Sequence, residues 1–206
     1  MLKLIGLQCY PQTLFRDVVK SFASKAGNFV GIKQTVPLEL LAAIEKIYHP
    51  AGLLVTTEPV LEAEGGAYQA CRFSLAGKNI VFRVAKTTPI KIGQFVTFSQ
   101  RRSPQGLLVP LDVADGVDFA VVQVSAGKQQ GQFIFERALL VAQGVLSRNG
   151  KGGKMAIRVY PPWSKPQAKQ AIKSQEWQLT RFLPLAEDGS ADITLTCRYL
   201  PENFKG

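Results

Sequence analysis

Apolar residues recur with two different periods along the chain. Before about residue 65 they follow helical spacing, and after it they alternate with polar residues over short runs, as in strands. The segments 15–27 and 36–52 are predicted to be helices that end near Gly27 and Pro50, and Pro37 suits the first turn of the second one. The predicted packing positions are Phe15, Val18, Val19 and Phe22 in the first helix, and Leu38, Leu41, Ile44 and Tyr48 in the second.

The pattern after residue 68 predicts a sheet. The predicted strands are 69–75, 79–86, 94–100, 117–124, 131–135 and 155–160. A short turn at 76–78 joins the first two, and the third is expected to continue the same sheet. The segment 117–124 is nearly all apolar, which is typical of a strand buried on both faces.

Two further helices are predicted after these strands begin. Residues 136–144 form a short helix that Gly144 closes. Ser164 and Gln167 have the spacing of a capping box, and Pro166 lies in the first turn of a helix that runs to Leu179. The packing positions of this helix are Ala168, Ala171, Ile172 and Leu179, and Lys165, Lys169 and Lys173 recur every four residues beside them.

These elements predict an α+β fold with a central mixed β-sheet flanked by helices and an N-terminal helical extension. A chain of 206 residues is long enough to bury one sizeable core. We therefore expect one domain over residues 1–206. It divides into a mainly helical part at 1–64, a core at 65–184 and a C-terminal tail at 185–206.

Charge is distributed unevenly along the chain, which has a net charge of +10. Residues 72–102 and 147–181 together hold 15 of the 25 basic residues and one of the 15 acidic ones. This segregation indicates a positive face that binds a polyanion. The alternative is a basic protein that its charge keeps soluble. A membrane surface is a weaker partner, because the sequence has no basic amphipathic helix with bulky apolar anchors.

The expected nucleic-acid contacts come from both basic segments. Basic side chains and loop amides meet phosphates, while aromatic rings stack on bases. Tyr160 and Trp163 are candidates for stacking, although a packing role is at least as plausible for Trp163. The complete set of expected contact residues is Arg83, Lys86, Lys91, Gln94, Arg101, Arg102, Lys151, Lys154, Arg158, Tyr160, Trp163 and Lys165.

Catalytic motifs are scarce. The sequence contains no Walker A, GxGxxG or GxSxG motif, and the single histidine, His49, excludes a His-rich metal site. Carboxylates that converge beside a lysine would hold Mg²⁺ for phosphodiester cleavage, and Glu64, Asp112 and Asp118 are the candidates. No acidic residue is followed two positions later by Lys, so the sequence has no (D/E)xK triplet. The nearest candidate is residues 84–86, where Val84 occupies the position of the required acid. The more economical interpretation places these carboxylates in loops and at strand entries.

Three segments resemble the MepB-like proteins of bacteria: "FRVAKTTPIKIGQFVTF", "VDFAVVQVSAGKQQGQFIF", and "IRVYPPW" followed by "KSQEWQLTRFL". The resemblance covers about residues 65–184. It implies a restriction-endonuclease-like core and a role in nucleic-acid binding, but no established reaction. The missing (D/E)xK triplet then favours a binder on a nuclease-like scaffold.

We therefore expect a cytoplasmic protein that binds nucleic acid, DNA rather than RNA, with weak sequence specificity and no cofactor. The three widely spaced cysteines fit a reducing compartment, and neither a signal peptide nor a membrane span is predicted. One alternative is a divergent nuclease that uses Mg²⁺ or Mn²⁺. A second alternative is a regulatory protein that binds a small anion or a nucleotide.

Overall fold

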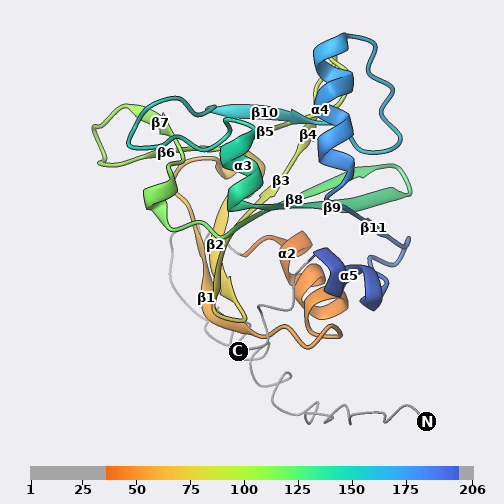
Figure 1. Cartoon of the computed structure of the whole chain (residues 1–206). Helices are drawn as coiled ribbons and strands as arrows, with labels where there is room; N and C mark the ends of the chain where they lie inside the picture. The colour runs from red at the N-terminus through yellow and green to blue at the C-terminus, as the bar shows by residue number, and fades with distance from the viewer. Residues whose placement is uncertain (1–35, 200–206) are drawn as a thin grey trace, which may run out of the picture. The chain divides into compact units, whose positions relative to one another are not determined.

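The computed structural model describes residues 36–199, and its architecture is a mixed sheet with helices on both faces (Figure 1). The main sheet has six strands in the order β1-β2-β3-β8-β9-β11. Their bounds are β1 Val55–Leu61, β2 Cys71–Leu75, β3 Lys78–Val84, β8 Phe119–Ala126, β9 Gln129–Glu136 and β11 Phe182–Leu185. Strands β3 and β8 are parallel, whereas the other neighbouring pairs are antiparallel. The predicted α+β class with a central mixed sheet is confirmed.

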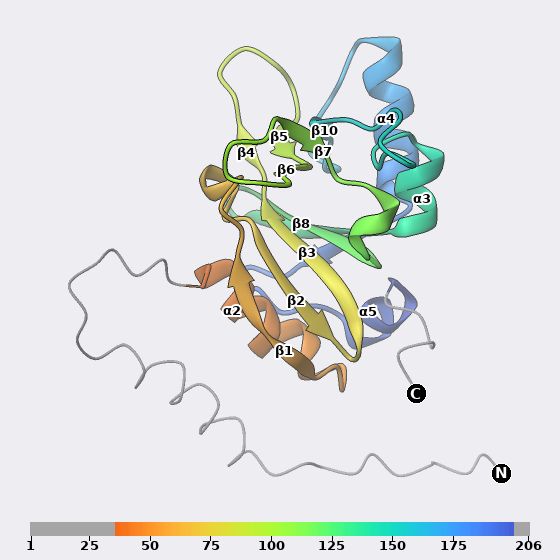
Figure 2. The ribbon, with the colours of Figure 1, turned by 90° about the vertical axis from the view of Figure 1, so that its left-hand side faces the viewer.

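The connection from β3 to β8 carries two smaller sheet elements. Strands β4 Lys86–Thr87 and β5 Gln94–Thr97 join β10 Ala156–Val159 in a three-stranded sheet of order β10-β5-β4. Strands β6 Ser99–Arg101 and β7 Leu108–Pro110 form a two-stranded ribbon. Figure 2 shows both above the main sheet, on the side that also carries α3 and α4.

Helices cover both faces of the main sheet. On one face lie α2 Leu38–Ala43, the π-helical turn η1 Ile44–Tyr48 and α5 Ile193–Tyr199, and on the other lie α3 Arg137–Ala142 and α4 Lys169–Leu179. Short 3₁₀ turns occur at η2 Gly66–Tyr68 and η3 Val113–Asp115. In the described residues no helix is both long and apolar enough to cross a membrane.

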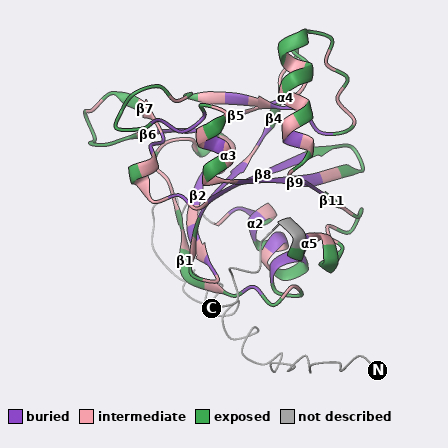
Figure 3. Ribbon diagram, in the orientation of Figure 1, coloured by how far each residue is buried: buried purple, intermediate pink, exposed green. Residues whose placement is uncertain are grey.

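The alternation of side chains along β8 and β9 separates two hydrophobic cores. Val121 and Ile134 face α2 and η1, whereas Val122 and Phe133 face the small sheet and α3. Figure 3 shows the buried residues concentrated in these central strands. Because both faces are covered, β8 needs apolar residues at successive positions, as its sequence predicted.

Several local predictions were wrong. Residues 55–61 form β1, a strand that the sequence pattern did not predict. Helix α2 and η1 pack through Leu40, Ala43, Ile47 and Tyr48, whereas Leu38 is 78% exposed. Leu40, Ala43 and Ile47 are three and four residues apart, so the packing face keeps helical spacing but is rotated from the predicted one, and Tyr48 belongs to both.

Two further predictions fail for tertiary reasons. The segment 94–100 does not continue the main sheet, because β5 pairs with β10 and β4 instead. Helix α4 begins only at Lys169, with Ala168 at its N-cap and no capping side-chain bond, so the expected capping box is absent. The predicted helix at 15–27 lies outside the described residues.

Candidate nucleic-acid interface

Three side chains form a row across the outer face of the three-stranded sheet. Phe95 on β5 stands opposite Lys86 on β4 and opposite Arg158 on β10. Directly opposed residues share one face of a sheet, so the three side chains lie side by side. Their strand neighbours Val96, Ile157 and Val159 point the other way, into the core. Packing of these neighbours therefore fixes which face the row occupies.

Tyr68 from η2 completes this group beside the row. Its ring lies 5.9 Å from the Phe95 ring, tilted by 58°. The Lys86 ammonium lies 5.9 Å from the Tyr68 centroid, and the Arg158 guanidinium carbon lies 5.7 Å from the Phe95 centroid. Both distances are within the range of cation–π interaction. We call Tyr68, Lys86, Phe95 and Arg158 the basic–aromatic face.

The loop between β4 and β5 fixes the position of Arg158. The guanidinium donates to the carbonyls of Lys91 and Gly93, at 3.3 and 3.1 Å, and to Thr88 Oγ1 at 2.7 Å. Gly93 has φ +83°, and a Cβ there would lie 2.6 Å from the Tyr160 ring. The loop thus needs glycine at this position, and it holds the exposed Lys91 next to Arg158.

Arg83 does not reach the surface, which corrects the expectation that it contacts phosphate. It is only 1% exposed and forms an ion pair with Glu62. The two facing atoms of this pair are not aligned as a hydrogen bond. Other guanidinium nitrogens donate to the carbonyls of Phe82 and Thr97, so Arg83 links β3 to the small sheet.

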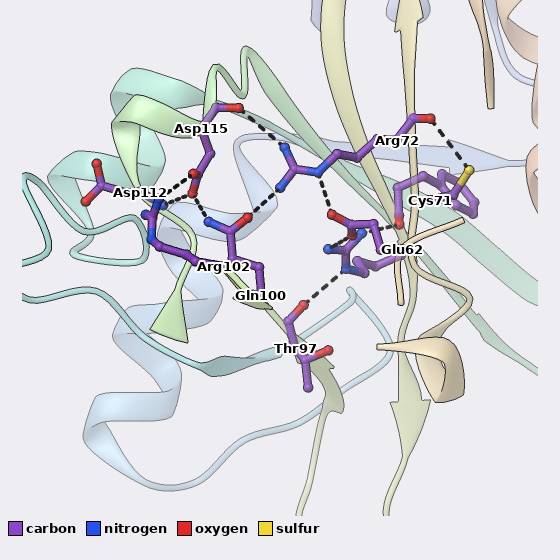
Figure 4. A network of polar contacts seen from close by, with 10 residues as sticks. Glu62, Cys71, Arg72, Thr97, Gln100, Arg102, Asp112 and Asp115 are labelled. Carbon is purple, nitrogen blue, oxygen red and sulfur yellow. Dashed lines mark hydrogen bonds and ion pairs between the residues drawn. The ribbon is translucent and has the colours of Figure 1, made fainter. Parts of the chain in front are cut away.

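The network around Glu62 continues toward the two-stranded ribbon (Figure 4). Arg72 donates to the other oxygen of Glu62 and to the side-chain oxygen of Gln100, and Gln100 donates to Asp115. Burial lowers the pKa of Arg83, whereas Glu62 opposes that shift. Arginine remains protonated in proteins. The network therefore stabilises a buried positive charge and does not act as a proton switch.

Gln94 and Tyr160 are buried, and Trp163 is partly buried against the core. Gln94 is 4% exposed, and its amide donates to Thr87 Oγ1 and to the Ser125 carbonyl. Tyr160 is 9% exposed, and Trp163 packs edge-on against Phe182 with centroids 5.8 Å apart. The prediction that these residues meet bases or sugars is therefore not supported, and the packing alternative for Trp163 holds.

The remaining predicted basic contacts are spread over the surface. Arg101 pairs with Glu64 and Arg102 with Asp115, so acidic partners partly neutralise both. Lys151 and Lys165 lie exposed in the segments before and after β10, and Lys154 lies just before that strand. Of the predicted set, the structure gathers Lys86, Lys91 and Arg158.

The three candidate catalytic carboxylates do not converge. Asp112 accepts from the Ser147 hydroxyl and from the amides of Ala114 and Gly150, and these bonds lower its pKa to about 2. Asp118 pairs with Arg137 and Glu64 with Arg101. Within residues 36–199, no group of three His, Cys, Asp or Glu side chains has the geometry to hold a metal ion. The contacts of Asp112 and Asp118 stabilise the local loop structure.

A cavity of about 570 Å³ opens between β10 and α4, next to the basic–aromatic face. Arg158 is a residue of both places, and its guanidinium lies on the basic–aromatic face. Lys154 and Lys173 line the cavity as well, together with Tyr160 and Trp177. Its volume lies within the range of small-ligand sites.

The sequence did not reveal Tyr68 and Phe95 as members of the site. Phe95 alternates with buried residues in a short strand, a pattern that shows its face but not the register against Arg158. Tyr68 lies in a 3₁₀ turn without a periodic signal. Only the pairing of β10, β5 and β4 brings the Phe95 ring between the two cations.

Comparison with known proteins gives one family. The family model described as MepB-like matches residues 62–184. The crystal structure of MepB is similar, with a TM-score of 0.59 and 34% sequence identity over 62% of this chain and 85% of that chain. No curated protein sequence matches the chain. The matched segment includes the main sheet from its second strand onward, the small sheet and α4, and the chain belongs to the MepB-like family.

Proposed function

We propose that this protein binds nucleic acid through the basic–aromatic face. The observation that carries the proposal is the row of Lys86, Phe95 and Arg158, in which an aromatic ring lies between two cations on one outward face. In proteins that bind single strands or track a backbone, basic side chains meet phosphates while aromatic rings stack on bases. Tyr68 widens the aromatic part of this surface.

Each residue of the site has a separate role in this proposal. Lys86 and Lys91 are exposed and contact phosphates as mobile point charges. Arg158 is held by the loop that follows β4, so its remaining donor capacity is preorganised. Phe95 and Tyr68 offer ring surface to a base or to a sugar. None of these groups reads a particular base, so weak sequence specificity follows, and DNA is the expected polymer.

The scaffold is proposed to be non-catalytic and related to restriction endonucleases. Its mixed sheet with a parallel β3–β8 pair is compatible with such a relation. The described carboxylates that could serve a nuclease, Glu64, Asp112 and Asp118, form ion pairs or hydrogen bonds with other partners. We further propose that binding needs neither a metal nor a cofactor and takes place in the cytoplasm, where the free thiols of Cys71 and Cys197 stay reduced.

The test is a fluorescence-anisotropy titration of labelled single- and double-stranded DNA and RNA at several salt concentrations. Affinity should fall as salt rises, because each phosphate contact releases counterions. The variant Lys86→Ala/Arg158→Ala should weaken binding to all sequences and lower the slope of log K against log salt by about 2. A matched control is Lys46→Ala/Lys128→Ala, which removes two exposed lysines outside the small sheet.

Two results would overturn the proposal. The first is an absence of binding at low salt, and the second is an equal loss of affinity in the control and in Lys86→Ala/Arg158→Ala. EDTA should leave binding unchanged. Cleavage of the oligonucleotides with Mg²⁺ or Mn²⁺ would replace the binder with the divergent nuclease, and Asp112→Asn and Asp118→Asn would then identify its carboxylates.

A further inference from the structure

Among the strands of residues 36–199, β10 is paired along one edge only. Its partner β5 lies on one side, and the Phe98 amide donates to the Met155 carbonyl at 2.8 Å across that pairing. In an antiparallel pair, successive residues direct their amide and carbonyl alternately toward and away from the partner strand. Ala156, Arg158 and Tyr160 therefore direct these groups away from β5, toward α4.

Gln178 of α4 occupies one part of this edge. Its side-chain amide donates to the Arg158 carbonyl at 2.8 Å and accepts from the Tyr160 amide at 2.8 Å. Gln178 is 1% exposed, so this planar donor–acceptor group is held in place. One side-chain amide thus forms hydrogen bonds with the carbonyl of one residue and with the backbone amide two positions later.

The same pair of groups recurs two residues earlier on the strand, at the Ala156 carbonyl and the Arg158 amide. Neither the Ala156 carbonyl nor the Arg158 amide has a hydrogen-bond partner among residues 36–199. Ala156 and Arg158 line the cavity between β10 and α4, so this part of the edge opens into a space of about 570 Å³. Figure 1 shows α4 standing beside the small sheet, with α3 below β10.

The charge of the cavity indicates an anionic ligand. Lys154 and Lys173 are among its lining residues, and none of the described residues that line it is acidic. Ala171 and Trp177 add apolar surface from α4. A ligand that fits must therefore combine a planar donor–acceptor edge with negative charge nearby.

We propose that this cavity binds an unpaired nucleobase, with its phosphate near Lys154 or Lys173. Adenine would donate its N6 amino group to the Ala156 carbonyl and accept from the Arg158 amide at N1. Every base offers a neighbouring donor and acceptor on its Watson–Crick edge, which duplex pairing hides. The inference rests on the proposed function and extends it: the preferred ligand class is single-stranded nucleic acid or a nucleotide end.

The experiment compares the affinity for labelled single-stranded oligo(dA) with the affinity for the oligo(dA)·oligo(dT) duplex. AMP serves as a competitor. The variant Ala171→Trp fills the cavity from α4, and Ala142→Trp is the matched control on the exposed side of α3. The wild-type protein should bind the single strand about tenfold more tightly than the duplex. Ala171→Trp should reduce single-strand affinity to the duplex level and leave duplex affinity unchanged, whereas Ala142→Trp should behave as the wild type.

Hydrogen exchange at the Arg158 amide gives a second readout that does not depend on a variant. Oligo(dA) should slow this exchange. AMP that also slows it, and displaces the oligonucleotide, would assign the site to a free nucleotide or a strand end, whereas protection by the oligonucleotide alone would assign it to a strand interior.

Failure of this inference is distinguishable from failure of the proposed function. Equal affinity for single strand and duplex, both weakened by Lys86→Ala/Arg158→Ala, would overturn the base site and leave the phosphate-binding face intact. Unchanged strand preference in Ala171→Trp would also overturn it. If an extended acidic peptide protects the amides of both Ala156 and Arg158 and the oligonucleotide protects neither, the edge pairs with an added strand instead.

Discussion

Replacing Glu62 by Gln should destabilise the protein far more than the same change at a surface acid. Glu62 is the ionic partner of Arg83, whose side chain is 1% exposed, and Glu62 itself is 15% exposed. The change keeps the shape of the side chain and leaves the Arg83 charge buried without a counter-charge.

Removal of one partner from a buried ion pair costs about 3–5 kcal/mol in the free energy of unfolding. The low end applies here, about 3 kcal/mol, because Glu62 is partly exposed and glutamine still accepts a hydrogen bond from Arg72. The matched control is Glu64→Gln, whose partner Arg101 is 35% exposed, and it should cost at most about 1 kcal/mol.

Urea unfolding at neutral pH measures both variants. The fluorescence of Trp163 and Trp177 reports the transition, because both rings pack against the hydrophobic core. Adding Arg83→Met to Glu62→Gln should recover part of the loss, since it removes the buried charge itself. Equal stability of Glu62→Gln and Glu64→Gln would refute the conclusion that Arg83 depends on its counter-charge.

Three further predictions concern pH, thiol reactivity and backbone conformation. Hydrogen bonds lower the pKa of Asp112 to about 2, below its unfolded value of about 3.9, so its stabilising effect is present above pH ~4 and is lost as pH falls toward ~2. The stability advantage of the wild type over Asp112→Asn, measured by urea midpoints, should shrink over that range, and a constant difference would contradict the assignment. Burial raises the pKa of the Cys71 thiol to about 12, whereas Cys197 is exposed. A thiol reagent at mildly alkaline pH should therefore label Cys197 in the native state but Cys71 only in unfolded protein. Mass spectrometry of the peptides measures both. Gly93→Ala should lower the free energy of unfolding in urea by more than about 1 kcal/mol and weaken oligonucleotide binding. The reason is that φ +83° strains alanine and that its Cβ meets the Tyr160 ring. Unchanged stability and affinity would show that the loop after β4 tolerates a side chain there.

The strands of the main sheet could be predicted from the sequence because their signal is local. Alternation in residues 71–75 and the apolar run at 119–124 each follow from which faces of a strand are buried. The turn at 76–77 between β2 and β3 likewise depends on neighbouring residues and could be predicted from them. The family was also recognisable, because long segments of sequence carried it.

The sequence predicted the basic character of the protein correctly, but not which of the basic side chains are exposed. Lys86 and Arg83 are three residues apart in one basic stretch, yet one side chain is exposed and the other is buried against Glu62. A strand alternates its faces, so neighbouring cations can have opposite environments, and the sequence does not show which acid lies across the pairing. For the same reason Gln94 was expected at the surface and lies inside.

The sequence by itself determined the class of fold, the basic character and the positions of most strands. Only the tertiary structure decided the site, because its members come from distant parts of the chain. Arg158 meets Phe95 because β10 pairs with β5 across some 60 residues of intervening chain, and β4 adds Lys86 from the other side of β5. That pairing is set by the burial of Val96, Ile157 and Val159 in a shared core. A local pattern records that each residue is apolar or charged, whereas the register between strands is fixed by how the whole core packs.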